Sequence, residues 1–286
     1  MQLRIGERLN VQKENSLITE DGKNPNALTP LTRFGCSFQC GGTHLARTMM
    51  LDELETLFAY IDRQNAPQAD YWYAICEENC LRKRSNKTRK LTYGHLSSLY
   101  LLDPRYPLFR ALRFFWSRDL EGHPLLALLC AYARDSILRV TAPFFLQITE
   151  ETLIDRTSLQ EYIDNLSPGR FSPATLQSTA RNLSATWTQS GHLKGRDRKV
   201  RTQASPTAGS VSFALLLGYI AGMRGETLFQ TEYAKLLDCS FDTAIVLAGE
   251  ASRRGWIILK RVGSVIEVRF PDLLIPKELG SIYEQN

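Results

Sequence analysis

Apolar residues recur at intervals of three and four along most of this chain, and this spacing predicts a mainly α-helical fold. Leu45, Met49, Leu54 and Phe58, for example, would share one face of a helix that begins at a Thr43 cap and extends to residue 61. Similar patterns predict helices over residues 70–82, 85–102, 107–117, 124–139, 149–166 and 172–189. The repeated alternation of strands and helices that a parallel sheet needs is missing.

The C-terminal part of the chain carries the strongest pattern. An apolar helix over residues 211–223 precedes a short amphipathic helix over 227–237, a tight turn, and a third helix that Ser240 can cap. Two β-rich runs then flank residues 263–264, a Gly-Ser pair typical of a two-residue hairpin turn. These elements follow one another in the order of a winged helix-turn-helix. The predicted fold is therefore a multi-helix body with a C-terminal winged helix-turn-helix carrying a small β-hairpin.

Three segments follow from these patterns. Residues 1–41 are rich in turn signals and predict a poorly structured N-terminal arm. Residues 42–205 would form the helical body, and residues 206–286 the winged-helix domain. A chain of 286 residues is long enough to bury the cores of two domains.

In winged-helix proteins that bind DNA, the third helix enters the major groove and the hairpin contacts the neighbouring backbone. Five cations of this module would lie beside the phosphates of a bound duplex. We call them the third basic group: Arg253, Arg254, Lys260, Arg261 and Arg269. The alternative is that this module binds a protein, because many winged helices do so. The N-terminal half of the third helix is also poor in side chains that read bases.

Two further clusters of cations occur in the body of this chain, whose net charge is +5. The first basic group is Arg82, Lys83, Arg84, Lys87, Arg89 and Lys90. It lies at a predicted helix start, where the helix dipole disfavours positive charge, so an anionic partner would explain it; a solvated turn is the alternative. The second basic group is Lys194, Arg196, Arg198, Lys199 and Arg201. Neither group carries the aromatic signatures of RNA-binding domains, which favours double-stranded DNA.

The chain shows none of the glycine-rich phosphate loops, nucleophile elbows or metalloprotease helices that mark common enzymes. We therefore predict a protein that is not an enzyme and needs no cofactor or metal. The Gly-Gly-Thr-His segment at 41–44 could bind an anion through free backbone N–H groups, although a simple capped helix is the stronger interpretation. The sequence contains two Cys-x3-Cys pairs, Cys36 with Cys40 and Cys76 with Cys80. Four such cysteines could bind zinc, and the alternative is that they pack in the core as small apolar side chains.

The location of the protein is predicted from its apolar runs. The N-terminus has no apolar core of a secretory signal. The longest apolar runs, at 125–133 and 213–223, are shorter than the ~20 residues that cross a bilayer. We expect a cytoplasmic protein without a membrane partner.

Several segments together resemble the BrxA family of BREX phage-defence systems. They are Gly-Thr-His-Leu-Ala-Arg-Thr-Met-Met at 42–50, Leu-Arg-Lys-Arg-Ser at 81–85, Ala-Arg-Asp at 133–135, Phe-Ser at 171–172 and Trp-Thr-Gln-Ser-Gly-His-Leu at 187–193. The resemblance covers about residues 43–220. It implies a small helical DNA-binding accessory protein encoded beside a methyltransferase, an ATPase and an alkaline-phosphatase-like protein. Shorter members of that family end near the position of Tyr219. The resemblance therefore implies that the winged helix of this chain is an added module.

The first functional hypothesis is a non-enzymatic DNA-binding accessory component of a bacterial BREX-type defence system. Its expected partners are double-stranded DNA and other phage-defence proteins of the same operon. Association with further copies of the same chain is left open. One alternative is an interaction scaffold of the defence complex. Another is a winged-helix transcriptional regulator of the operon.

Overall fold

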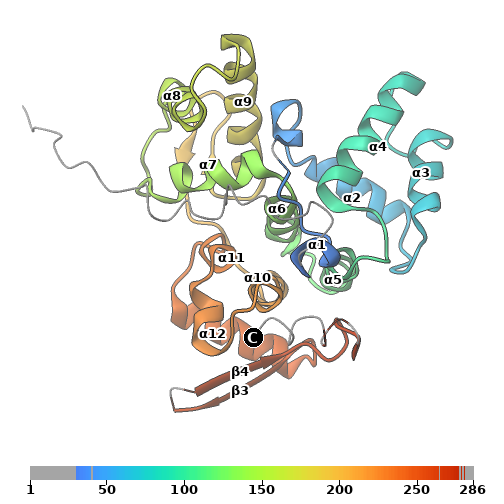
Figure 1. Cartoon of the computed structure of the whole chain (residues 1–286), viewed down its shortest axis with the longest axis vertical. Helices are drawn as coiled ribbons and strands as arrows, with labels where there is room; N and C mark the ends of the chain where they lie inside the picture. The colour runs from blue at the N-terminus through green and yellow to red at the C-terminus, as the bar shows by residue number, and fades with distance from the viewer. Residues whose placement is uncertain (1–29, 40, 264, 277, 279, 281–286) are drawn as a thin grey trace, which may run out of the picture.

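The structure of this protein is a computed structural model that describes residues 30–39, 41–263, 265–276, 278 and 280. The described chain is mainly helical, with one short antiparallel hairpin in the middle and a longer one near the C-terminus (Figure 1). Most of the N-terminal arm predicted for residues 1–41 lies outside the described residues. No helix within the described ranges has the length and apolar character needed to cross a bilayer.

The first half of the body consists of helices joined by irregular connections. Their bounds are α1 Pro30–Phe34, η2 Thr43–Leu45, α2 Leu51–Tyr60, α3 Gln68–Cys76, α4 Asn86–Tyr100 and α5 Pro107–Trp116. The prediction of one continuous helix over residues 43–61 is wrong. Thr43 begins only a single 3-10 turn, and Met50 adopts a left-handed backbone (φ 57°) that separates this turn from α2. Ser85 caps α4 as predicted, since its Oγ accepts a hydrogen bond from the Thr88 amide at 3.2 Å.

The second half of the body contains longer helices and the first hairpin. Their bounds are α6 His123–Arg134, α7 Ser136–Leu146, α8 Arg156–Leu166, α9 Pro173–Gln189, β1 Leu193–Lys194 and β2 Val200–Arg201. The helix predicted over 124–139 is broken at Asp135, whose carboxylate caps α7 by accepting from the Leu138 amide at 3.0 Å. Ser172 and Pro173 begin α9 as expected.

The C-terminal elements follow the predicted order. Their bounds are α10 Ala208–Ile220, η3 Gly225–Gln230, α11 Glu232–Lys235, α12 Phe241–Arg253, β3 Ile258–Val262 and β4 Val265–Arg269. The amphipathic helix predicted over 227–237 is instead a 3-10 turn, η3, followed by the single turn of α11. The hairpin is antiparallel and pairs Val262 with Val265 across its turn. Ser264 of the predicted turn lies outside the described residues.

Helix α10 is the centre of the molecule. Every one of its residues is buried. It packs against α5 and α6 of the body on one side and against α11 and α12 on the other (Figure 1). Asp119 of the body fixes the N-terminus of α10, because its Oδ2 accepts from the Gly209 amide at 2.7 Å. A single hydrophobic core therefore continues across the boundary predicted at residues 205 and 206.

Candidate nucleic-acid interface

Helix α12 presents one packed face and one free face. Ser240 caps it as predicted, with its Oγ accepting from the Thr243 amide at 3.1 Å. The inner face carries alanines at 244, 248 and 251, whose small side chains let α12 lie close to α10. The outer face is exposed and includes Asp242, Val246 (65% exposed) and Arg253. This face is open to a partner molecule.

The C-terminal hairpin is anchored along one face and free along the other. Ile266 and Val268 are buried, and β4 packs against η3. The opposite face and the tip are open, and the tip residues Val262 and Val265 are 80% and 70% exposed. The hairpin therefore projects from the molecule beside α12, at the bottom of Figure 1. A projecting hairpin next to a free helix face is the arrangement that a wing requires.

The cations of the third basic group differ in availability. Arg254 pairs with Glu250 and stacks over the Trp256 ring, with its guanidinium carbon 4.9 Å from the ring centre. Arg269 donates to Glu267 Oε1 from its Nε at 2.6 Å. The other three, Arg253, Lys260 and Arg261, are exposed and form no ion pair within the described part of the chain. They are the cations most available to an anionic partner.

The second basic group is largely occupied by contacts within the protein. The side chain of Arg201 is only 4% exposed and binds Asp238 through two hydrogen bonds of 2.8 Å each. Lys194 pairs with Glu151 at 2.9 Å, and Lys199 donates to the backbone oxygen of Gly195 at 2.6 Å. The remaining two cations, Arg196 and Arg198, are exposed on the turn between β1 and β2. Arg201 is therefore an internal ion-pair partner, whereas Arg196 and Arg198 are exposed and form no ion pair with a described residue.

The first basic group also divides into bound and exposed cations. Lys83 pairs with Glu53 at 2.9 Å. Arg89 donates to the backbone oxygens of Cys76 and Glu77, at 3.2 and 3.4 Å, at the C-terminal end of α3, where the helix dipole favours a cation. The other four are exposed, without an ion pair to any described residue: Arg82, Arg84, Lys87 and Lys90.

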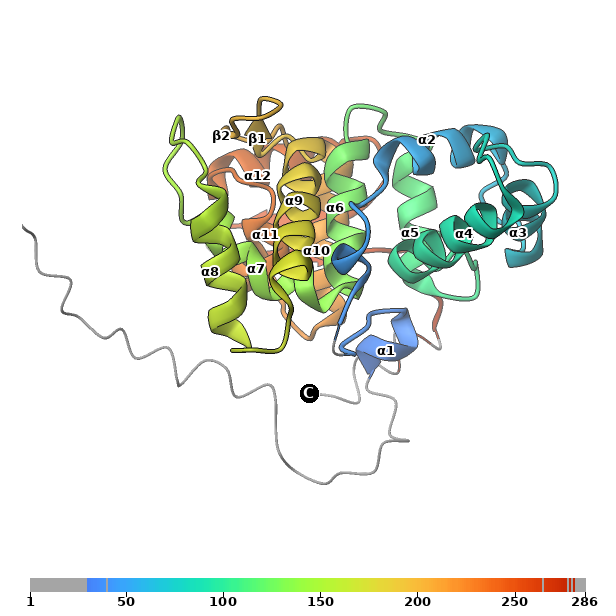
Figure 2. The same cartoon turned by 90° about the horizontal axis from the view of Figure 1, so that it is seen from above.

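The three basic groups do not form one continuous surface. The first lies in the connection from α3 to α4 and at the start of α4, at the upper right of Figure 1, whereas β3 and β4 lie at the bottom. Viewed from above, β1 and β2 also lie far from α3 (Figure 2). Arg201 of the second group binds Asp238, just before the N-terminus of α12, whereas the third group lies at the C-terminal end of α12 and on the β3–β4 hairpin. The first basic group therefore lies apart from the C-terminal hairpin.

The Gly-Gly-Thr-His segment already holds an anion that the chain itself supplies. The His44 amide donates to Asp135 Oδ2 at 3.1 Å, and His44 Nδ1 lies 2.9 Å from the same oxygen. Burial raises the pKa of Asp135, but the charge and hydrogen bonds of His44 outweigh it, so this carboxyl pKa lies below its usual value. Thr186 of α9 completes the buried network through its Oγ1, 3.0 Å from His44 Nε2. Residues far apart in the sequence make this network, so the sequence pattern alone could not reveal it.

The cysteines that the structure describes do not assemble around a common centre. Over the described residues, no group of three His, Cys, Asp or Glu side chains is placed to hold a metal ion. Cys36 and Cys76 are buried, and burial raises the pKa of the Cys36 thiol to about 11. Cys40 lies outside the described residues, so the predicted pair of Cys36 and Cys40 stays a prediction.

No protein-family model matches this chain, and a search of curated proteins finds no match. The resemblance to the BrxA family therefore rests on the sequence segments quoted above. Function has to be argued from the surface that the residues create.

Proposed function

We propose that this protein is a non-enzymatic double-stranded DNA-binding protein whose C-terminal elements form a winged helix-turn-helix. In this proposal α11 and α12 are the helix-turn-helix, and the β3–β4 hairpin is the wing. One observation carries the proposal. The free face of α12 is followed by a projecting hairpin, and Arg253, Lys260 and Arg261 along this path have no ion pair among the described residues.

The distribution of charge supports contact with phosphates more than with bases. Asp242 is exposed in the first turn of α12, where a recognition helix meets base edges, and a carboxylate there repels the duplex. The available cations lie at the other end of α12 and on the hairpin. Contacts to phosphates carry no sequence information directly. We therefore propose binding that depends weakly on DNA sequence.

The resemblance to the BrxA family supports the further proposal that the protein is an accessory component of a BREX-type phage-defence system. A regulator of the operon would need a sequence preference of ~4 kcal/mol or more over random DNA. The interaction scaffold stays the second candidate, and one observation favours it. Val246 on α12 and the paired residues Val262 and Val265 at the hairpin tip are exposed, and exposed aliphatic side chains are suited to a protein partner.

The proposed interface is tested by reversing the charge of its three available cations. Three phosphate contacts should give the wild-type protein a salt slope of about −2.7, so duplex affinity should fall about fortyfold between about 50 and 200 mM salt. The triple variant Arg253→Glu, Lys260→Glu, Arg261→Glu should bind more weakly and lose most of that slope. Fluorescence anisotropy with a short labelled duplex of random sequence measures both quantities.

A matched control uses three exposed cations of the first basic group. The variant Arg84→Glu, Lys87→Glu, Lys90→Glu changes the net charge by the same amount at a distant site. It should keep the steep salt slope of the wild type. Equal losses in both variants, or no binding of the duplex by the wild type, would contradict the proposed interface.

A further inference from the structure

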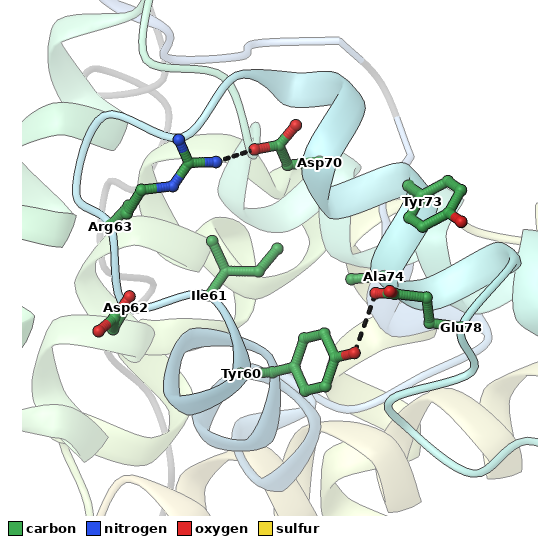
Figure 3. A pocket seen from close by; sticks show the side chains of 8 residues that line it. All are labelled: Tyr60, Ile61, Asp62, Arg63, Asp70, Tyr73, Ala74 and Glu78. Carbon is green, nitrogen blue, oxygen red and sulfur yellow. Dashed lines mark hydrogen bonds and ion pairs between the residues drawn. The ribbon is translucent and has the colours of Figure 1, made fainter.

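A surface pocket of about 270 Å³ lies where the C-terminal end of α2 meets α3 (Figure 3). Its floor is apolar and consists of Ile61 and Ala74, both buried. Tyr60 and Tyr73 form its sides, and their side chains are 53% and 54% exposed. Four charged residues complete the lining: Asp62, Arg63, Asp70 and Glu78. None of these residues belongs to the proposed DNA interface.

The charge of the pocket is opposite to that of the whole chain. Three carboxylates and one guanidinium line it, although the net charge of the chain is +5. Arg63 is bound to Asp70, as Figure 3 shows. Glu78 accepts a hydrogen bond from the Tyr60 hydroxyl at 3.0 Å, and this contact raises the pKa of Tyr60. Asp62 is exposed and has no ion pair to any residue that the structure describes.

These features specify the chemistry of a ligand. The carboxylates repel anions and attract a cation, and the faces of Tyr60 and Tyr73 add cation–π attraction. The apolar floor suits the aliphatic stem of a lysine or arginine side chain, whose charged head would lie at the rim, where Asp62 stands on one side of the floor and Glu78 on the other (Figure 3). The volume lies below the roughly 300–1,000 Å³ of most small-molecule sites, so it fits a single side chain better than a cofactor.

We propose that this pocket binds a lysine or arginine side chain from a basic segment of a partner protein. The site is separate from α12 and the C-terminal hairpin, so the protein can hold a basic partner at α2 and α3 while α12 faces another molecule. The proposal does not depend on DNA binding, because no residue is shared between the two surfaces. It gives the protein a second recognition site with the opposite charge preference.

Peptide titrations followed by NMR test the site on the whole chain. The probes are the peptide acetyl-Gly-Gly-Arg-Gly-Gly-amide, its lysine counterpart, and a citrulline counterpart that keeps the shape of arginine without its charge. A cationic peptide should shift the amide resonances of Ile61 and Ala74 in a saturable manner. The citrulline peptide should bind about five- to tenfold more weakly, because cation–π and charge attraction are lost.

Matched variants locate the binding. Tyr73→Ala and Asp62→Asn should each weaken the better cationic peptide about fivefold, since one removes a ring face and the other a charge. Tyr73→Phe keeps the ring and should retain binding. Glu161→Gln, an exposed residue of α8, removes one negative charge elsewhere and should have no effect. Circular dichroism of each variant checks that the fold is kept.

The proposal is overturned if neither cationic peptide gives a saturable shift at Ile61 and Ala74. It is also overturned if citrulline binds as well as arginine, or if Glu161→Gln weakens binding as much as Asp62→Asn does. The last result would mean that cationic peptides bind to general negative charge and not to this pocket.

Discussion

Replacing Asp238 with alanine is expected to lower the free energy of unfolding by about 3–5 kcal/mol, because it leaves the buried Arg201 guanidinium without its counter-charge. The Arg201 side chain is 4% exposed, so nearly all of its surface is shielded from water that could replace the lost carboxylate. Asp238 Oδ2 also accepts from the Ala204 amide at 3.1 Å, and this donor would lose its partner as well.

Urea denaturation of the wild type and the Asp238→Ala variant measures this loss. The control is Lys194→Met, which breaks the ion pair between Lys194 and Glu151 in the same hairpin region. These side chains are 57% and 72% exposed, and an exposed pair contributes only about 0–1 kcal/mol. Similar small losses in the two variants would show that the pair of Arg201 and Asp238 is as weakly coupled to folding as a surface pair.

Acidification should destabilise the protein through His192 before the carboxylates titrate. Burial lowers the pKa of His192 from 6.5 to about 4, against an opposing effect of Asp238. The ring is neutral in the fold, with Nε2 3.1 Å from the Leu236 oxygen and Nδ1 2.9 Å from Ser190 Oγ. Between pH 6.5 and about 4 the unfolded chain binds a proton that the folded chain excludes. Stability is therefore complete above pH 6.5 and falls by about 3 kcal/mol as the pH drops to about 4.

Denaturation curves at several pH values measure this dependence. His192→Gln keeps an amide donor for Leu236 and removes the titrating ring, so the variant should lose most of the slope between pH 6.5 and 4. The comparison is His95→Gln. The pKa of His95 is also lowered by burial, but this residue is less enclosed, so its replacement should leave the larger part of the slope. A His192→Gln variant with the slope of the wild type would contradict the assignment.

Local signals in the sequence predicted local structure well. Ser85, Ser172 and Ser240 each cap the helix that follows them, because capping depends only on residues three positions apart. The breaks at Met50 and Asp135 were not predicted. At these positions the backbone follows distant partners: the Met49 amide donates to Thr186 Oγ1 at 2.9 Å, and Asp135 binds His44. Tertiary contacts of this kind leave no periodic signal.

The candidate DNA-binding cations show the same limit. Arg253, Lys260 and Arg261 are exposed as the sequence predicted. Arg89 and Arg201 also lie in basic stretches of the sequence. In the fold, however, Arg89 binds carbonyl groups at the end of α3, and Arg201 binds Asp238. A run of cations shows where charge is concentrated along the chain. It does not show which guanidinium groups turn inward, or that α4 and the C-terminal hairpin lie on different sides of the molecule (Figure 1).

The complete burial of α10 has a consequence for how any molecule held by α12 is oriented. In the proposed winged helix, α10 is the first helix of the module, yet it is also the helix against which α5 and α6 pack. The module and the body therefore turn together, without a hinge between them. A duplex seated on α12 would run at a constant angle to α2 and α3, so the direction of the DNA would fix where a protein bound at the distant end is placed along it.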